Sequence, residues 1–65
     1  MKAYEAKKGS IVVVIDDNVR VRHQTPVVKK GDTITIGRLD GMYCNGTNED
    51  GESVCIAAWT QITYL

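Results

Sequence analysis

Apolar and polar residues alternate through much of the chain with a period of two, and no long stretch repeats with the period of a helix. Thr33–Ile36 alternates strictly, which predicts a strand with both isoleucines turned inward and both threonines outward. Ile11–Ile15 is instead an unbroken run of β-branched residues, which favours a strand buried on both faces or wrapped by a barrel. The pattern therefore predicts an all-β protein.

The segments on either side of Asn48–Gly51 form a predicted hairpin. If these four residues are the loop, Thr47 faces Glu52, and counting outward pairs Cys44 with Cys55. We therefore expect the only two cysteines of the chain to meet across this hairpin.

A second predicted hairpin follows the β-branched run. Asp16–Asn18 is typical of a three-residue turn, and Val19–His23 alternates as a return strand. This pairing places the odd-numbered residues of Ile11–Ile15 on the inner face. Val12 and Val14 then point away from the paired face, where barrel curvature or another subunit must cover them.

The remaining turns divide the chain into five or six short antiparallel strands. Lys29–Asp32 and Asp40–Gly41 are turn signals because glycine adopts positive φ at little cost. Ala58–Thr60 is predicted as a single helical turn or a corner, and Gln61–Leu65 as a short closing strand. Residues 1–65 make one domain, and the strand count and spacing resemble a small, partly open SH3-like barrel.

A more local resemblance covers roughly residues 34 to 60. It rests on Leu39-Asp40-Gly41-Met42-Tyr43-Cys44, on the Asp50-Gly51 turn and on Ala57-Ala58-Trp59-Thr60. This pattern is similar to a group of short uncharacterised phage proteins. The resemblance implies a viral origin and no particular activity, and Asp16–Lys30 has no counterpart in it.

Size and charge narrow the function classes. A chain of 65 residues buries only about 60% of the surface that its unfolded form exposes, so the core is small. The formal charge is zero, but the part before Leu39 carries +4 and the rest carries −4. No leader, membrane span or lipidation signal stands out, so we expect a soluble protein of the cytoplasm, the host's if the protein is viral.

Catalytic chemistry has few candidate residues here. One histidine, His23, would have to serve two cysteines, and no carboxylate pair has a spacing that turns the two groups toward each other. We therefore expect no enzyme, no cofactor and no metal site. For Cys44 and Cys55, two buried thiols are the favoured interpretation, while a disulfide and a metal site stay open as alternatives.

The leading hypothesis is a small binding module that acts by protein–protein interaction with a host or viral partner or with its own copies. Trp59 is either a core residue, which is the favoured interpretation in a chain without phenylalanine, or an exposed contact residue. A homo-oligomer is expected, with an interface that includes Val12, Val14 or Ile62–Leu65. The candidate protein-binding residues are Val12, Val14, Tyr43, Trp59 and Tyr64.

The alternative function is nucleic-acid binding by a basic face with Tyr43 as its aromatic neighbour. A solvated face is the simpler interpretation of these charges, because strands need polar residues on their outer side. A third hypothesis is an oligomer that holds a small molecule between subunits. The candidate nucleic-acid-binding residues are Arg20, Arg22, Lys29, Lys30 and Arg38.

Overall fold

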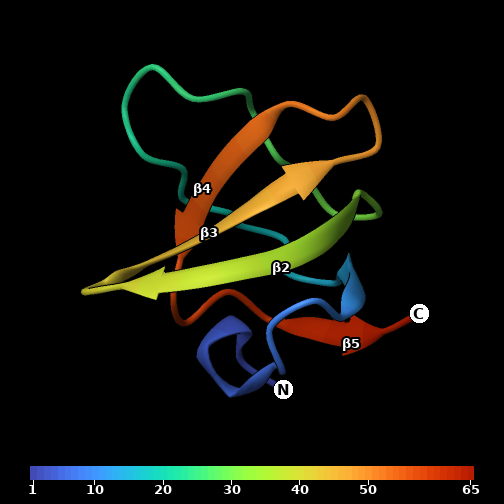
Figure 1. The fold of residues 1–65 in the computed structure, drawn as a ribbon. Coiled ribbons are helices and arrows are strands. Elements are labelled where there is room, and N and C mark those ends of the chain that lie inside the picture. Colours follow the sequence, from blue (N-terminus) through green and yellow to red (C-terminus); the bar gives the residue numbers. More distant parts are fainter.

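The computed structural model describes residues 1–65 and contains five strands and one short 3₁₀ helix (Figure 1). All strand pairs are antiparallel and form one open sheet in the order β4-β3-β2-β1-β5. The prediction of an all-β protein is confirmed. None of the helical structure is long and apolar enough to cross a membrane. The elements in chain order are η1 (Ala3–Glu5), β1 (Ile11–Val14), β2 (Thr33–Asp40), β3 (Tyr43–Asn48), β4 (Ser53–Ala57) and β5 (Ile62–Tyr64).

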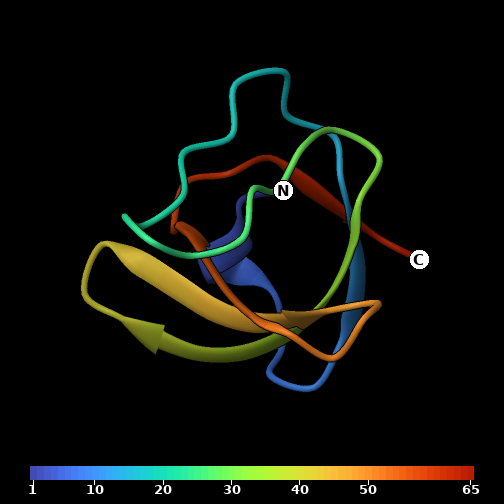
Figure 2. The same ribbon diagram turned by 90° about the horizontal axis from the view of Figure 1, so that it is seen from above.

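The sheet curls around its inner face, as Figure 2 shows from above. The pairing of β2 with β3 is irregular between Ile36 and Leu39, where a bulge-like shift bends the strand. Both outer strands are partly covered: Lys2 pairs with Gln61 at the start of β5, and Val21 pairs with Ile56 of β4. The bend and the two covered edges leave little unpaired strand edge exposed.

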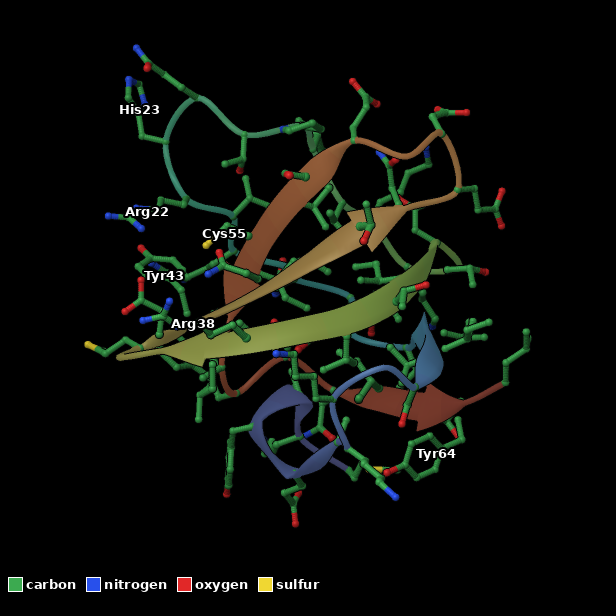
Figure 3. All side chains as sticks on the ribbon, in the orientation of Figure 1. Arg22, His23, Arg38, Tyr43, Cys55 and Tyr64 are labelled. Atoms are coloured by element: carbon green, nitrogen blue, oxygen red, sulfur yellow. The ribbon has the colours of Figure 1, made fainter.

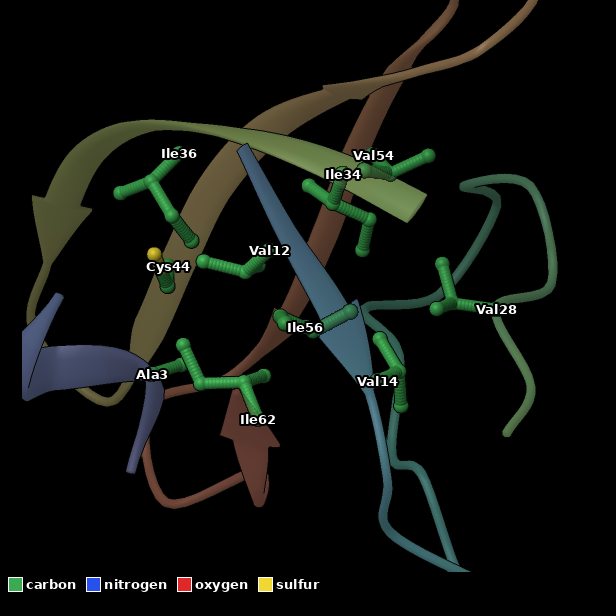
Figure 4. Packing of buried hydrophobic residues seen from close by; sticks show 10 residues of the cluster. All are labelled: Ala3, Val12, Val14, Val28, Ile34, Ile36, Cys44, Val54, Ile56 and Ile62. Carbon is green, nitrogen blue, oxygen red and sulfur yellow. The ribbon is translucent and has the colours of Figure 1, made fainter. Parts of the chain in front are cut away.

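A cluster of ten buried residues fills the inside of the curl (Figure 4). Ile34 and Ile36 of β2 point into it and Thr35 points to solvent, so the alternation read from Thr33–Ile36 is confirmed. The members of the cluster are Ala3, Val12, Val14, Val28, Ile34, Ile36, Cys44, Val54, Ile56 and Ile62.

The predicted faces of β1 are wrong. Val12 and Val14 are 0% exposed, whereas Ile11 and Ile15 are about half exposed. The reason is the pairing of β1, which lies between β2 and β5 with Val12 opposite Ile34 and Val14 opposite Ile62. Since directly opposed residues share a face, the even-numbered valines face the core and are not available to a partner protein.

The predicted hairpin after β1 is also wrong. Val19–His23 forms no strand and contributes only the single bridge from Val21 to Ile56. The carboxylate of Asp16 accepts hydrogen bonds from the backbone N–H groups of Gln61 (3.0 Å) and Asn18 (3.0 Å). These bonds hold the chain against the start of β5, so it does not turn back along β1.

The hairpin of β3 and β4 forms, but its register differs by one position from the prediction. The loop is three residues, Glu49–Gly51, because the side-chain oxygen of Asn48 accepts hydrogen bonds from the N–H groups of Asp50 (3.0 Å) and Glu52 (2.9 Å). Gly51 has φ +81°, which suits the last position of such a loop. Cys44 therefore faces Ile56, while Cys55 faces Asn45, so the expected meeting of the two cysteines is wrong.

The other predicted turns give a mixed outcome. The Asp40–Gly41 turn is confirmed, since Asp40 pairs with Tyr43 and Gly41 has φ +61°. The helical turn or corner expected at Ala58–Thr60 is a β-turn in which the Thr60 N–H donates to the Ala57 carbonyl at 3.0 Å. The Thr60 hydroxyl donates to the same oxygen at 2.7 Å, which fixes this turn. The only 3₁₀ helix lies at Ala3–Glu5.

Candidate functional site

An apolar groove of about 220 Å³ lies between η1 and the bent part of β2. The 3₁₀ helix is held in place by long-range backbone bonds, including that from the Ala3 N–H to the Thr60 carbonyl at 2.8 Å. These bonds dock Ala3 into the core and leave Tyr4 beside the bend of β2. The residues that line the groove are Ala3, Tyr4, Ala6, Lys8, Ile36, Gly37, Arg38, Leu39 and Cys44.

Four large apolar side chains are 43% to 66% exposed at and beside this groove: Tyr4, Leu39, Met42 and Trp59. Tyr4 and Leu39 line it. The backbone of Ala58 brings the other two to the same end, because its carbonyl accepts from the Tyr4 N–H (2.9 Å) and its N–H donates to the Met42 carbonyl (2.8 Å). The interpretation of Trp59 as a core residue is therefore wrong, and the exposure of Trp59 leaves it available as a contact residue.

Cys44 contributes the buried floor of the groove. Burial raises the pKa of its thiol, and the neighbouring Cys55 raises this pKa further. A raised pKa keeps the thiol protonated at neutral pH, and a protonated thiol is a poor nucleophile. Cys44 thus acts as a small apolar surface in this groove.

Cys55 lies on the other face of the sheet, on the same side as Tyr43, since Asn45 and Cys55 pair two positions along from Tyr43 and Ala57. Both cysteines are buried and unlinked in this structure, and two free thiols in solution stay a prediction. His23 is exposed on the connection after Arg22. Because the two thiols face opposite sides of the sheet, these three residues do not line one common pocket.

Arg22 and Arg38 lie on the same side of the molecule as Tyr43 (Figure 3). The Arg22 guanidinium carbon lies 5.7 Å from the centre of the Tyr43 ring. The backbone N–H of Arg22 donates to the Cys55 carbonyl at 2.9 Å. The Arg20 carbonyl accepts from the Ala57 N–H at 2.9 Å, opposite Tyr43 in the sheet. Arg38 extends along the same side of the molecule in Figure 3.

The two lysines of the predicted basic face lie elsewhere. The Lys30 ammonium forms an ion pair with Asp17 at 3.0 Å. Lys29 lines a polar groove of about 320 Å³ beside the β3–β4 loop, together with Asp32, Glu49 and other residues. The five basic residues proposed for nucleic acid therefore divide into an arginine group and a separate lysine pair.

Tyr64 lies on the far side of the molecule from the arginine group (Figure 3). Its hydroxyl oxygen accepts a hydrogen bond from the Lys7 N–H at 3.3 Å, and its side chain is half exposed. It belongs to neither the apolar groove nor the arginine group. The candidate protein-binding residues are thus spread over the core, the groove and two further surfaces.

The sequence pattern did not predict the groove, because it predicts no element before Ile11 that could pack against β2. A signal was nevertheless present at the next turn. Leu39 and Met42 flank the Asp40–Gly41 turn, where a tight hairpin between exposed strand ends normally carries polar residues. Two large apolar residues at such a turn therefore indicate an exposed apolar surface at this end of the hairpin.

Comparisons of this chain with protein-family models, with curated proteins and with solved structures find no match.

Proposed function

We propose that this protein is a non-enzymatic protein-interaction module whose apolar groove receives a large apolar side chain from a partner protein. The observation that carries the proposal is that Tyr4, Leu39, Met42 and Trp59, four of the ten large apolar residues that the fold leaves exposed, belong to segments that meet at and beside one groove. Concentrated apolar surface on a small protein marks sites of interaction with other proteins. Tryptophan and tyrosine are also enriched among the residues that dominate binding energy.

The size of the groove supports a protein partner over a small molecule. Small-molecule sites enclose about 300–1,000 Å³, and this groove has about 220 Å³ and is open to solvent. The larger groove beside the β3–β4 loop has almost entirely polar and charged walls. A side chain anchored on a partner protein needs less enclosed volume, because the surrounding protein surface supplies the remaining contacts.

At the level of the fold, we propose a small SH3-like barrel in which the curled sheet is partly open. Three features support this arrangement: the strand order, the bent β2 that pairs along both β1 and β3, and the long connection between β1 and β2. A phage origin stays a proposal that rests on the Leu39–Cys44 pattern. Neither proposal identifies a partner, because one fold supports many functions.

Affinity purification from expressing cells, with matched variants, tests the proposed function. Trp59→Ala and Leu39→Ala each remove a half-exposed side chain at the groove end, whereas Leu65→Ala removes an even more exposed one at the C-terminus. A partner recovered by the wild type should still bind Leu65→Ala and should bind the groove variants at least about tenfold more weakly, as expected for dominant contact residues.

The result that would overturn the proposal is a partner that binds all four proteins equally. Isothermal titration with the purified partner gives the affinities, and circular dichroism of each variant shows whether the fold is retained. Equal affinity in folded variants would place the binding surface away from the groove.

Nucleic-acid binding stays the alternative, and the arginine group around Tyr43 favours it. Binding through these three arginines would weaken with salt with a log–log slope of about −2 to −3. However, Arg22 already covers one face of the Tyr43 ring, and that face is then not free to stack on a base. A gel-shift series over salt concentration tests this alternative.

A further inference from the structure

Charge gathers at the two opposite ends of the β3–β4 hairpin. We name Arg20, Arg22 and Arg38 the arginine end, and Glu49, Asp50 and Glu52 the acidic tip. The arginine end surrounds Tyr43 at the start of β3, and the acidic tip follows Asn48 at its end. Five residues of extended strand, about 17 Å, separate these two positions. The opposite charges are therefore too far apart to meet within one molecule.

None of these six side chains has an ionic partner in the chain. The only ion pair in the molecule joins Lys30 to Asp17 at 3.0 Å. All six side chains belong to exposed residues. The protein thus carries one patch with an excess of positive charge and one with an excess of negative charge, although its formal net charge is zero. Each patch has a single opposite charge beside it: Asp40 pairs with Tyr43, and Lys29 lines the same polar groove as the acidic tip.

Local contacts fix the shape of both patches. Asn48 accepts hydrogen bonds from the N–H groups of Asp50 and Glu52, and its amide nitrogen donates to the Glu52 carboxylate at 3.0 Å. At the other end, Arg22 is held over the Tyr43 ring and by its backbone bond to Cys55. Patches that are already ordered lose less conformational freedom when they bind.

We propose that the acidic tip of one molecule docks on the arginine end of a second copy, so that the protein associates head to tail. Charge complementarity on the same chain identifies the occupant, since the tip is an ordered acidic projection and the arginine end lacks an intramolecular partner. The two surfaces differ, so each added copy leaves one of each kind free. Such an interface extends into short linear chains or closes into a ring.

The arginine end borders the apolar groove of the proposed function, because Arg38 belongs to both. Neither Arg20 nor Arg22 lines that groove, and no residue of the acidic tip does, so substitutions at these positions test the association alone. A failure of head-to-tail association therefore leaves the groove proposal unaffected, and the reverse also holds.

Sedimentation of the wild-type chain at several ionic strengths is the first test. Lowering the salt from about 0.15 M to about 0.01 M lengthens the electrostatic screening distance from about 8 Å to about 30 Å. We expect the average mass of a concentrated sample to rise at low salt by about a factor of two over the 7.2 kDa monomer. A wild type that stays monomeric throughout overturns the proposal.

A charge exchange provides the specific test. The tip variant Glu49→Lys with Asp50→Lys and the arginine-end variant Arg20→Glu with Arg22→Glu should each stay monomeric at low salt, because like charges then face one another. Mixing the two variants should restore association, since each supplies the charge that the other has reversed. Association of either variant alone at the wild-type level, or no association of the mixture, overturns the proposal.

Two controls keep this result interpretable. The tip substitutions lie in an exposed loop, so the tip variant remains a valid test even if the arginine-end variant does not fold. Titration with a single-stranded DNA oligonucleotide tests whether the arginine end binds nucleic acid and not a second copy of the chain. Salt-sensitive binding of that oligonucleotide by a wild type that does not self-associate would overturn the proposal in favour of nucleic acid.

Discussion

At the scale of single residues, Gly46 shows how the absence of a side chain at one position lets two strands approach closely. A Cβ atom at this position would lie 2.6 Å from the Thr35 carbonyl oxygen and 2.7 Å from Cγ2 of Ile34. Both distances are shorter than any normal contact, and one of the atoms belongs to the backbone. Strands β2 and β3 can therefore approach this closely only because residue 46 is glycine.

The first prediction compares this glycine with one in open space. Gly46→Ala should lower the free energy of unfolding by about 2 kcal/mol, because the added methyl group forces strands β2 and β3 apart. At Gly51, an added Cβ would have no atom within 4 Å, but the residue has φ +81°. Gly51→Ala should therefore lower the free energy of unfolding by only about 1 kcal/mol, from backbone strain alone. Urea unfolding of both variants measures the difference, and equal losses would contradict the close approach at Gly46.

Asp16 gives the second prediction, which concerns pH. The pKa of its carboxyl lies below the ordinary value of 3.8, chiefly because the carboxylate accepts the Gln61 N–H and also the Asn18 N–H. A pKa that folding lowers adds stability above the unfolded-state value, and that stability is lost as the pH falls through the folded-state value. Asp16 therefore stabilises the fold at neutral pH and stops doing so in acid.

Asp16→Asn should accordingly melt at a lower temperature than the wild type at pH 7, and the gap should close as the pH falls below 3.8. Asp17→Asn is the matched control, because Asp17 forms only the exposed ion pair with Lys30 and should change the melting temperature little. Thermal unfolding followed by circular dichroism across this pH range provides the measurement. A gap that widens in acid would show that the sign is wrong.

At the scale of whole elements, the buried face of a strand was predictable only where apolar and polar residues alternate along it. Thr33–Ile36 marks its own outer face with threonines, so its buried face was predictable. Ile11–Ile15 has no polar residue to mark either face, and its orientation depends on the strands that pair with it. Those partners, Ile34 and Ile62, are distant in the sequence, and the sequence pattern alone did not identify them.

The third prediction tests the orientation of β1. Val12→Ala removes buried methyl groups and should cost about 2 kcal/mol of unfolding free energy, since Val12 is fully buried. Ile11→Ala removes a larger but half-exposed side chain and should cost about 1 kcal/mol or less. Chemical denaturation ranks the two, and a larger loss for Ile11→Ala would restore the orientation that the sequence pattern favoured.

The register of the β3–β4 hairpin and the candidate site were also not predictable from the sequence pattern alone. The position of the hairpin was predictable from its turn residues, but its register was not, because it depends on which backbone groups the Asn48 side chain binds. Trp59, favoured as a core residue, is instead 43% exposed, and Tyr43 is half-buried beneath Arg22. The apolar groove was not predictable, because it exists only where η1 packs against β2 through long-range contacts.

At the scale of the whole molecule, the protein is a 65-residue chain with one cluster of ten buried apolar residues and no covalent cross-link. Domains of this size retain only a few kcal/mol of net stability, because the burial of a small core barely exceeds the loss of conformational entropy. The cysteines do not change this balance. Cys44 packs in the core, and Cys55 lies on the opposite face of the sheet.

The fourth prediction follows from that balance. Urea unfolding should be a single cooperative transition with a free energy of about 3 to 5 kcal/mol and a slope of about 1 kcal/mol per molar urea. Adding a thiol reductant should leave the midpoint unchanged, because no disulfide contributes to the fold. A midpoint that falls when reductant is added would show that Cys44 and Cys55 are linked in solution, which requires β4 to shift by one residue against β3 into the register that pairs them.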